Sequence, residues 1–349
     1  MSVLAPIRAD LRADLRADRR GRRRRSLIVN AALAAIVGLL LLITLTMGSV
    51  RLSARQVVLS LLGLMDNDAV NFVVQDIQWP QAKSAIATGL ALGLAGTLFQ
   101  QLLRNPLASP DFVGISSGAS VAAVAGIVIY DFGGLGIPAL AVMGAVVSSV
   151  LMYVLAWKDV INGYRFILIG IGVSTFMYGL VGYLLTHSRL EEAREAMHWL
   201  IGSVGQSGNT EVNLLLGALA VLVPLSLVLR RLLRSLELGD DTARVLGTHA
   251  ETARLVLIGV AVVLTGLATA VAGPLIFVAL VAGPIADRLL GSAAGGLLAA
   301  AAVGAAVVLA SDYVAVNLMP TQLPTGVVTG AVGAPYLLWL LATTNREST

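Results

Sequence analysis

Ten apolar runs divide this chain, and no other feature restricts its fold as strongly. They cover residues 27–47, 82–103, 112–130, 137–157, 165–186, 212–233, 254–272, 274–290, 294–311 and 325–342. A helix needs about 20 apolar residues to cross the hydrocarbon core of a bilayer. Only 13% of the residues are charged, whereas soluble domains carry about 25%. The sequence therefore predicts an all-α membrane protein with ten transmembrane helices, of which two are separated only by the short break at Pro274.

Arginine is concentrated before the first apolar run. Nine of the 24 Lys and Arg residues precede residue 26, and they end in Arg22-Arg23-Arg24-Arg25. The run that follows is too long for a signal peptide, and no small-residue cleavage site stands out. We divide the chain into a cytosolic basic tail at 1–26, a transmembrane domain at 27–342 and a cytosolic tail at 343–349. The basic tail is interpreted as solvated rather than as a lipid-binding helix, because its Asp residues offset much of the charge.

The distribution of basic residues predicts the orientation. With the N-terminus in the cytosol, 19 Lys and Arg residues fall on the cytosolic side of the alternating loops and five on the outer side. Cytosolic loops of membrane proteins carry such an excess. We expect a multi-pass protein of the bacterial cytoplasmic membrane with both termini in the cytosol.

Small residues recur at four-residue spacing in two of the runs. Gly89 and Gly93 form one row, and Ala301 and Ala305 form another. Such rows let helix backbones approach closely. We interpret them as packing within one bundle rather than as a subunit interface.

A polar insert at 236–252 interrupts the apolar pattern. Gly239 is expected to end the preceding helix, Asp240 or Asp241 to begin a short new one, and Gly247 to close it. The insert lies on the predicted cytosolic side and is too short to be a domain. We interpret it as the surface by which a partner grips the chain, and the alternative is a solvated loop that only links two spans.

Several chemistries are not expected of this sequence. It has no Gly-x-x-x-x-Gly-Lys-[Ser/Thr] motif, no His-x-x-x-His pair and no cysteine, which excludes a P-loop and thiolate metal sites. No bound cofactor, metal site, nucleic-acid partner or enzymatic activity is expected. A proton- or sodium-coupled carrier usually needs ionisable groups within its spans. The pattern of apolar runs instead places four aspartates in loops or at helix ends: Asp76, Asp111, Asp131 and Asp312.

Three separated stretches carry a resemblance. The first, RNPLASPDFVGISSGA, runs from Arg104 to Ala119; the second is the insert at 238–247; the third, from Leu323 to Leu341, contains LPTGVVTG and GAPYLLWLL. In this order and spacing they resemble the FecCD-type permeases of ABC importers for iron chelates, heme and cobalamin, from about residue 33 to residue 342. The resemblance implies a type II importer architecture similar to that of cobalamin importers.

The resemblance also implies roles for particular residues. The insert would sit in a groove of an ATPase subunit and transmit its closure, through Leu238, Gly239, Asp240, Asp241, Ala243, Arg244, Leu246 and Gly247. A cytoplasmic gate would lie in the loop between spans four and five, at Asn162, Gly163 and Tyr164. The structural signature comprises Arg104, Asn105, Pro106, Pro324 and Gly326. Independently of the resemblance, Pro106 and Pro110 are expected to break the second span, and Ser109 or Asp111 to cap the third.

The outer face departs from the family pattern. Two arginines usually flank a Leu-Pro pair at the outer start of the second span, where this chain has Gln78 and Gln81 around Trp79-Pro80. A third expected arginine falls at Val316-Asn317, and Gln322 replaces a Glu. An amide lacks the charge-assisted contact that arginine makes with a carboxylate. Either the binding protein docks through neutral contacts here, or a companion permease carries the charges; we favour such a heterodimer over a homodimer.

The eighth span departs as well. Phe277 to Ala282 fits the family, but the Pro-(His or Gln) that should follow becomes Gly283-Pro284, and Asp287 stands where an arginine is expected. A proline displaced by one residue moves the kink and the carbonyl that the kink exposes.

These observations favour the permease subunit of a binding-protein-dependent ABC importer. Its partners would be ABC ATPase subunits, a second permease, an extracytoplasmic binding protein and the lipid bilayer. The Ser109-Pro110-Asp111-Phe112 variant is most similar to ferric-siderophore permeases, so an iron–siderophore complex is the expected cargo, with heme and cobalamin as alternatives. A secondary transporter driven by an ion gradient is the alternative mechanism, since backbone carbonyls can bind sodium.

Overall fold

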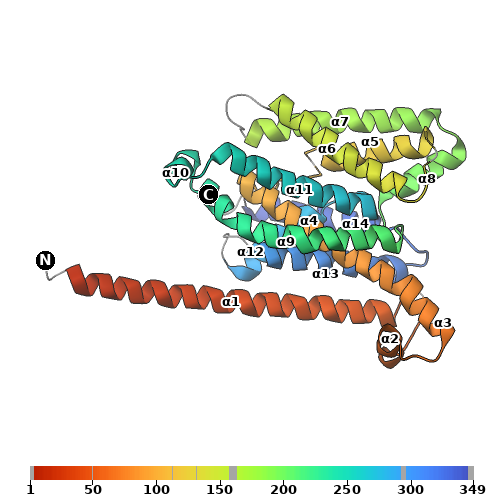
Figure 1. Ribbon diagram of the computed structural model, residues 1–349, viewed down its shortest axis with the longest axis horizontal. Coiled ribbons are helices and arrows are strands. Elements are labelled where there is room, and N and C mark those ends of the chain that lie inside the picture. The colour runs from red at the N-terminus through yellow and green to blue at the C-terminus, as the bar shows by residue number, and fades with distance from the viewer. Residues whose placement is uncertain are drawn as a thin grey trace.

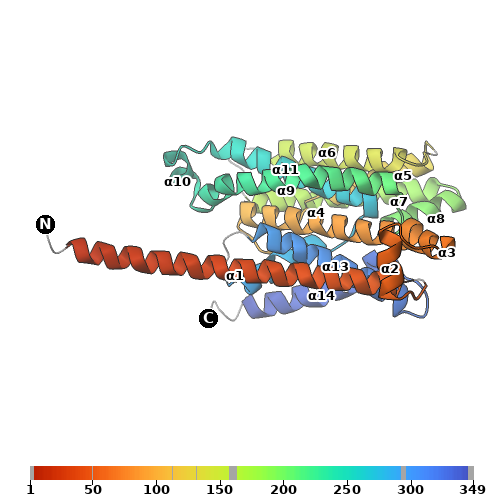
Figure 2. The same cartoon turned by 60° about the horizontal axis from the view of Figure 1, so that its bottom comes forward.

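The computed structural model describes residues 4–48, 50–111, 113–130, 132–156, 163–291 and 296–344. Within these ranges the chain is built from helices without named strands. The axes of the long helices lie roughly parallel or antiparallel to one another. Helix α1 lies along one side of the bundle and extends beyond the other helices (Figures 1 and 2). The elements are α1 (Leu4–Thr46), α2 (Ala54–Leu61), α3 (Asp68–Asn71), the π-helix η1 (Phe72–Gln78), α4 (Trp79–Leu103), α5 (Ile115–Val128), α6 (Gly136–Ala156), α7 (Gly163–His187), α8 (Leu190–Ile201), α9 (Asn209–Glu237), α10 (Asp240–Val245), α11 (Ala250–Ala272), α12 (Val278–Leu290), α13 (Leu297–Asn317) and α14 (Thr325–Thr344).

Each of the ten predicted apolar runs coincides with one of these helices, so the all-α prediction is confirmed. Seven spans among the described residues are long and apolar enough to cross a membrane, and α5 and α14 supply shorter apolar stretches. The count of ten transmembrane helices remains a prediction. The break at Pro274 is present, because Gly273 and Phe277 both adopt positive φ and separate α11 from α12.

Helix α4 lies at the centre of the bundle and packs against α13, α11, α12 and α9. A Cβ atom on Gly93 would lie 2.3 Å from the Ala300 carbonyl oxygen, and one on Gly304 would lie 2.2 Å from the Gly89 carbonyl oxygen. These backbones therefore touch without intervening side chains. The small-residue rows pack inside one bundle, as the sequence predicted.

The sides of the bundle are apolar. Val147 on α6, Phe176 on α7 and Val221 on α9 are 59%, 61% and 65% exposed. All backbone groups of a helix are satisfied within it except at its ends, which suits such a surface to lipid. The apolar exterior therefore fits a bilayer environment.

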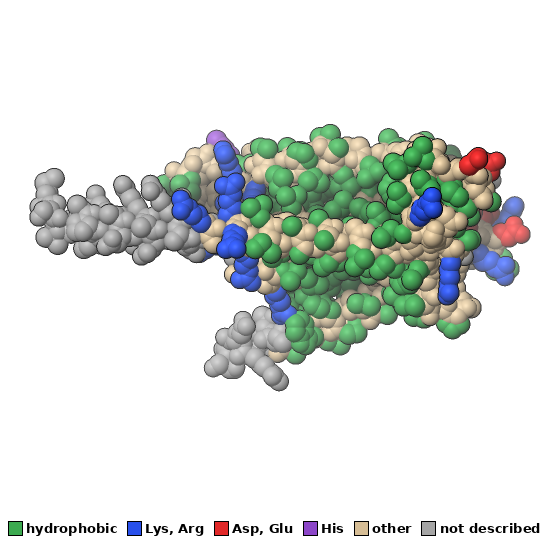
Figure 3. All heavy atoms as spheres, turned by 90° about the horizontal axis from the view of Figure 1, so that it is seen from below, with side chains coloured by type: hydrophobic (Ala, Val, Ile, Leu, Met, Phe, Trp, Pro, Cys, Tyr) green, Lys and Arg blue, Asp and Glu red, His purple; other side chains and the backbone are tan. Residues whose placement is uncertain are grey.

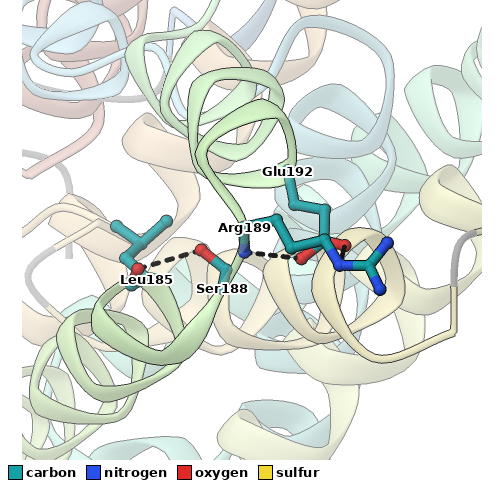
Figure 4. A network of polar contacts seen from close by, with 4 residues as sticks. All are labelled: Leu185, Ser188, Arg189 and Glu192. Atoms are coloured by element: carbon teal, nitrogen blue, oxygen red, sulfur yellow. Dashed lines mark hydrogen bonds and ion pairs between the residues drawn. The ribbon is translucent and has the colours of Figure 1, made fainter.

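Four short elements lie outside the predicted spans: α2, α3, η1 and α8. Ser53 caps α2 in a capping box with Gln56. At the start of α8 the Glu192 carboxylate accepts a 2.9 Å bond from the Arg189 backbone N–H and lies 3.9 Å from Arg189 Nε, next to a Ser188 hydroxyl that donates to Leu185 (Figure 4). These local contacts turn the chain where α7 ends.

Several helix ends differ from the sequence-based expectation. Helix α13 continues to Asn317, so Asp312 lies inside a helix with 1% exposure rather than at its end. Helix α5 begins at Ile115, because Gly114 adopts φ 94° and occupies its N-cap position. Neither Ser109 nor Asp111 caps it. Helix α1 begins at Leu4, so the boundary at residue 26 is one of composition and not a break in the helix.

Candidate functional site

The polar insert forms a short helix at one end of the molecule (Figure 1). Helix α10 begins after Gly239, which has φ 105° and ψ 152°, and ends before Gly247, which has φ 80°. Side-chain-bearing residues rarely adopt positive φ. Two glycines thus set the angles at which the chain enters and leaves α10, with the boundaries that the sequence predicted.

Backbone hydrogen bonds close the end of α10. The Thr248 N–H donates to the Ala243 carbonyl at 2.9 Å, and the Gly247 N–H donates to the Arg244 carbonyl at 3.0 Å. This is the Schellman arrangement, in which a glycine ends a helix and satisfies its last carbonyls. Thr248 Oγ1 also lies 3.0 Å from Ser235 Oγ of α9. The insert is therefore an ordered element tied to α9, rather than a loosely solvated loop.

Exposed apolar side chains lie at both ends of α10. Leu238, Val245 and Leu246 are 62%, 88% and 61% exposed, whereas Ala243 is fully buried against the bundle. Asp241 and Arg244 form an exposed 3.7 Å ion pair beside them. A hollow of about 520 Å³ lies next to α10 and is lined by Arg244 and residues 247–252. Exposed apolar side chains at the end of a membrane bundle are suited to burial against a protein partner.

The first signature stretch meets the insert in space. Arg104 ends α4 with φ 49° and donates a hydrogen bond through Nη2 to the carbonyl of Leu236, three residues before Gly239. The central helix α4 is thereby connected to the base of the insert. Sequence spacing alone gave no sign of this contact, because 132 residues separate the two partners.

The rest of this stretch forms a turn built on its own polar groups. Asn105 Oδ1 accepts a 2.9 Å bond from the Leu107 N–H, which orients the chain at Pro106. Asp111 accepts bonds from Ser116 Oγ at 2.6 Å and Ser109 Oγ at 3.2 Å. Burial raises the pKa of the Asp111 carboxyl, and the two hydroxyl donors partly oppose that rise. The turn is thus held by side chains as well as by its prolines.

Three glycines from distant parts of the chain meet at the opposite end. The Gly326 N–H donates to the Gly202 carbonyl at 3.0 Å, and a Cβ on Gly326 would lie 2.0 Å from the Ile201 carbonyl oxygen. A Cβ on Gly273 would lie 2.9 Å from the Gly202 Cα. The first turn of α14, after Pro324, therefore packs directly on the backbone where α8 ends. Of the other glycines on α14, Gly333 packs against Phe277 and Gly330 faces open space.

The residues at the outer-face positions that differ from the family pattern contact other parts of this chain. Gln78 is 4% exposed and donates to the Val50 carbonyl at 3.2 Å. Gln81 Nε2 lies 3.1 and 3.0 Å from the two carboxylate oxygens of Asp312, whose Oδ1 also accepts a 3.0 Å bond from Thr325. Asn317 donates to the Tyr313 carbonyl, and Val316 is half-buried in the last turn of α13. Gln78 and Gln81 thus bind inward, and the sequence did not anticipate their partners.

The displaced proline of α12 has a compensating partner. Pro284 has no N–H, so the carbonyl of Leu280 loses its helical donor. Gln100 Nε2 of α4 donates to that carbonyl at 2.9 Å, and a Cβ on Gly283 would lie 2.0 Å from Gln100 Oε1. Gly283 therefore makes room for the amide that replaces the missing bond, which explains why glycine precedes the proline here.

Of the predicted gate, Asn162 lies outside the described residues, and Gly163 and Tyr164 begin α7.

These features define the class. This is an all-α membrane protein with a short helix, α10, at one end of its bundle. The model of the FecCD transport family matches residues 35–343, and the chain belongs to that family.

Individual relatives are similar over most of their length. The ferric enterobactin transport system permease protein FepG of Escherichia coli (strain K12) is 41% identical over 86% of this chain and 91% of its own. The Fe(3+)-citrate import system permease protein YfmE of Bacillus subtilis (strain 168) is 36% identical over 91% and 96%. A solved structure described as an inward-facing metal-chelate type ABC transporter shares the fold, with a TM-score of 0.80, 23% identity, and coverage of 90% of this chain and 99% of its own.

Proposed function

We propose that this chain is the permease subunit of a binding-protein-dependent ABC importer and carries a ferric-siderophore complex across the cytoplasmic membrane. The cargo follows the relatives, two of which are named for import of ferric enterobactin and ferric citrate. ATP would be hydrolysed by separate subunits, since the sequence lacks a P-loop. The observation that carries the proposal is α10 itself, a short helix held between two positive-φ glycines and bordered by exposed apolar side chains.

The ATPase would bind the surface formed by Leu238, Val245 and Leu246. Burying these side chains would favour association, because each removes apolar area from water. Two connections would then pass ATPase movement inward: the short link from α10 to α11, whose start is held to α10 by the Schellman bonds, and the Arg104 contact from α4 to α9. Rotation of α10 would then move α4, the central helix of the bundle. Gly163 and Tyr164 at the start of α7, with Asn162, remain the proposed gate.

The end that carries α10 would face the cytosol, and both termini would lie there. Lys and Arg side chains lie at this end of the molecule, and others lie at the opposite end (Figure 3). The excess of 19 over five in the sequence favours this end for the cytosol. The binding protein would dock at the opposite end. Because Gln78 and Gln81 bind inward there, these two positions would offer the binding protein no cationic contact, and we favour a companion subunit as the source of docking charges over docking through neutral contacts.

A second permease subunit would complete the pathway, and we favour a different chain over a second copy. Helix α7 offers a surface for it. Gly172, Gly179 and Gly182 on this helix have open space where a Cβ would stand, and small residues let a neighbouring transmembrane helix approach closely. A companion that carries the missing outer arginines would supply cationic contacts for the binding protein.

The test exploits the open space at Gly247. A Cβ there meets nothing within 4 Å, so Gly247→Trp adds bulk outside the bundle and costs about 1–2 kcal/mol of backbone strain. Reconstituted with its ATPase, the variant should insert and fold but lose ferric-siderophore transport that depends on ATP. Gly63→Trp is the matched control, because Gly63 has φ 69° and equally open surroundings far from α10.

Normal ATP-driven uptake by Gly247→Trp would refute the coupling role of α10. Uptake by the purified chain without any ATPase would instead support the ion-driven carrier.

A further inference from the structure

An arginine-lined cavity lies between α1 and α9 at the end of the molecule that carries α10. Its volume is about 390 Å³. Arg22 and Arg23 line it from α1, Arg230 and Arg234 line it from α9, and the first turn of α13 forms another wall. Four arginines from two helices thus line one space, although 207 residues separate Arg23 from Arg230 in the sequence.

The arginines of α1 are held on this side by the packing of the helix. The residues of α1 that line the cavity recur with helical spacing, at 22, 23, 26, 27 and 30. A neighbouring arginine, Arg25, points elsewhere and donates through Nε to the Leu289 carbonyl at the end of α12, at 3.2 Å. Leu33, further along α1, is buried with Ala299 and Val303 of α13. The helical phase of α1 therefore fixes which arginines face the cavity.

The lining of the cavity is basic. None of the described residues that line it is acidic. Glu237, at the end of α9, interacts electrostatically with Arg230 and Arg234 but is not a lining residue. The wall from α13 begins at Gly296, where no side chain caps the helix, and the N–H groups of a first helical turn add partial positive charge. The lining of the cavity therefore carries a net positive charge.

Apolar side chains border the same cavity. Leu27 is 64% exposed, Leu298 is 46% exposed and Leu227 is 37% exposed, and all three line it. A soluble inorganic anion would gain nothing from these side chains. A phospholipid would place its phosphate among the arginines and its acyl chains along the leucines, at the depth where a transmembrane bundle meets the headgroups.

We propose that this cavity binds the phosphodiester headgroup of an anionic phospholipid. The site is distinct from the α10 surface and does not depend on the transported cargo. It assigns Arg22 and Arg23, at the end of the basic tail, to lipid, where the sequence alone favoured a solvated tail. Bound lipid would join α1 to α9, the helix that leads into α10.

The test uses the full-length chain in phosphatidylcholine nanodiscs with increasing fractions of phosphatidylglycerol or cardiolipin. Bound lipid is counted by native mass spectrometry, and the thermal midpoint is measured in parallel. Arg230→Gln combined with Arg234→Gln is compared with the matched control Arg231→Gln, because Arg231 is exposed on the same helix and does not line the cavity. A basic side chain near an anionic membrane contributes about 1 kcal/mol, so loss of two should weaken binding about 30-fold, whereas loss of Arg231 alone should weaken it by about 5-fold at most.

A further arm adds inorganic phosphate to discs of phosphatidylcholine alone. A loss of anionic lipid of about 30-fold in the double variant, with about 5-fold at most in Arg231→Gln, supports the proposal. Equal binding by the double variant and the control would overturn it, because the lipid would then be an unselective annulus. Equal thermal stabilisation by inorganic phosphate would overturn the assignment to lipid and identify a site for a free anion.

Discussion

The Arg104 guanidinium donates a hydrogen bond to the carbonyl of Leu236, and it does so from a left-handed backbone conformation at the end of α4. The residue thus combines a strained backbone with a long-range contact. Glycine is the residue that ordinarily occupies such a position at a helix end. Arginine in this conformation costs about 1–2 kcal/mol relative to glycine. We infer that the side-chain contact with Leu236 offsets this cost.

Substitution of Arg104 separates these two roles. Arg104→Gly should relieve the backbone strain while losing a hydrogen bond of about 1 kcal/mol, so the thermal midpoint should change little. Arg104→Ala keeps the strain and should be less stable. Both variants should couple ATP hydrolysis to transport less tightly than the parent, as measured in proteoliposomes. Full coupling in Arg104→Gly would contradict a transmitting role for this contact.

The bond from Gln100 to Leu280 predicts a rescue. Gln100→Leu should leave the buried Leu280 carbonyl without a donor and cost about 1–3 kcal/mol in the free energy of unfolding. Pro284→Ala restores the backbone N–H that normally serves this carbonyl. The double variant should therefore recover part of the loss. Thermal denaturation of the parent, the two single variants and the double variant in one detergent completes a double-mutant cycle. Strictly additive losses of stability would contradict the idea that Gln100 replaces the bond missing at Pro284.

The pair formed by Gln81 and Asp312 should be strongly coupled. Gln81→Met removes the amide that contacts both carboxylate oxygens and leaves Asp312 with the bond from the Thr325 hydroxyl. Asp312 then lacks part of its hydrogen bonding in a buried position, so the single variant should lose about 1–3 kcal/mol. Replacing both residues by apolar ones, Gln81→Met with Asp312→Leu, should cost less than the sum of the two single losses. Thermal denaturation of the single and double variants measures the coupling energy, and a value near zero would show that the contact contributes little.

The raised pKa of Asp111 predicts a dependence of stability on pH. The unfolded carboxyl loses its proton near the ordinary value of 3.8, whereas the buried one in the folded protein keeps it to higher pH. Stability should therefore fall as pH rises from 3.8 until the folded pKa is passed. Asp111→Asn should flatten this part of the profile, measured as thermal midpoint against pH.

Asp241→Asn is the control for that profile, since its carboxylate is fully exposed on α10. A profile for Asp111→Asn as steep as that of the parent would contradict the assignment to Asp111.

Periodic apolar runs and glycine boundaries were sufficient to predict most of the fold. The ten runs each coincide with a helix, the break at Pro274 is present, and Gly239 and Gly247 bound α10 as expected. These features are local, because hydropathy and positive φ depend on a few neighbouring residues. Helix α8 was missed although Arg189 to Glu192 carries a local signal, half of a capping box.

Contacts between distant residues could not be predicted in the same way. The sequence marked Arg104, Gln81 and Pro284 as notable, yet their partners Leu236, Asp312 and Gln100 became apparent only from the packing of the helices. Two of these bonds end on backbone carbonyls, which every residue possesses. No residue type therefore identifies such partners, and their meeting depends on the rotation and depth of each helix.

The unbroken course of α1 from Leu4 to Thr46 makes its two ends rotate together. Each added residue turns an α-helix by about 100°. One alanine inserted between Arg25 and Ser26 would keep the charge of the tail but swing Arg22 and Arg23 from the cavity to another side, while Leu33 stayed packed on α13. An insertion of about seven residues would restore their direction and raise them by about two turns. The rotation of the helix, rather than the number of basic residues in the tail, thus decides whether these arginines line the cavity.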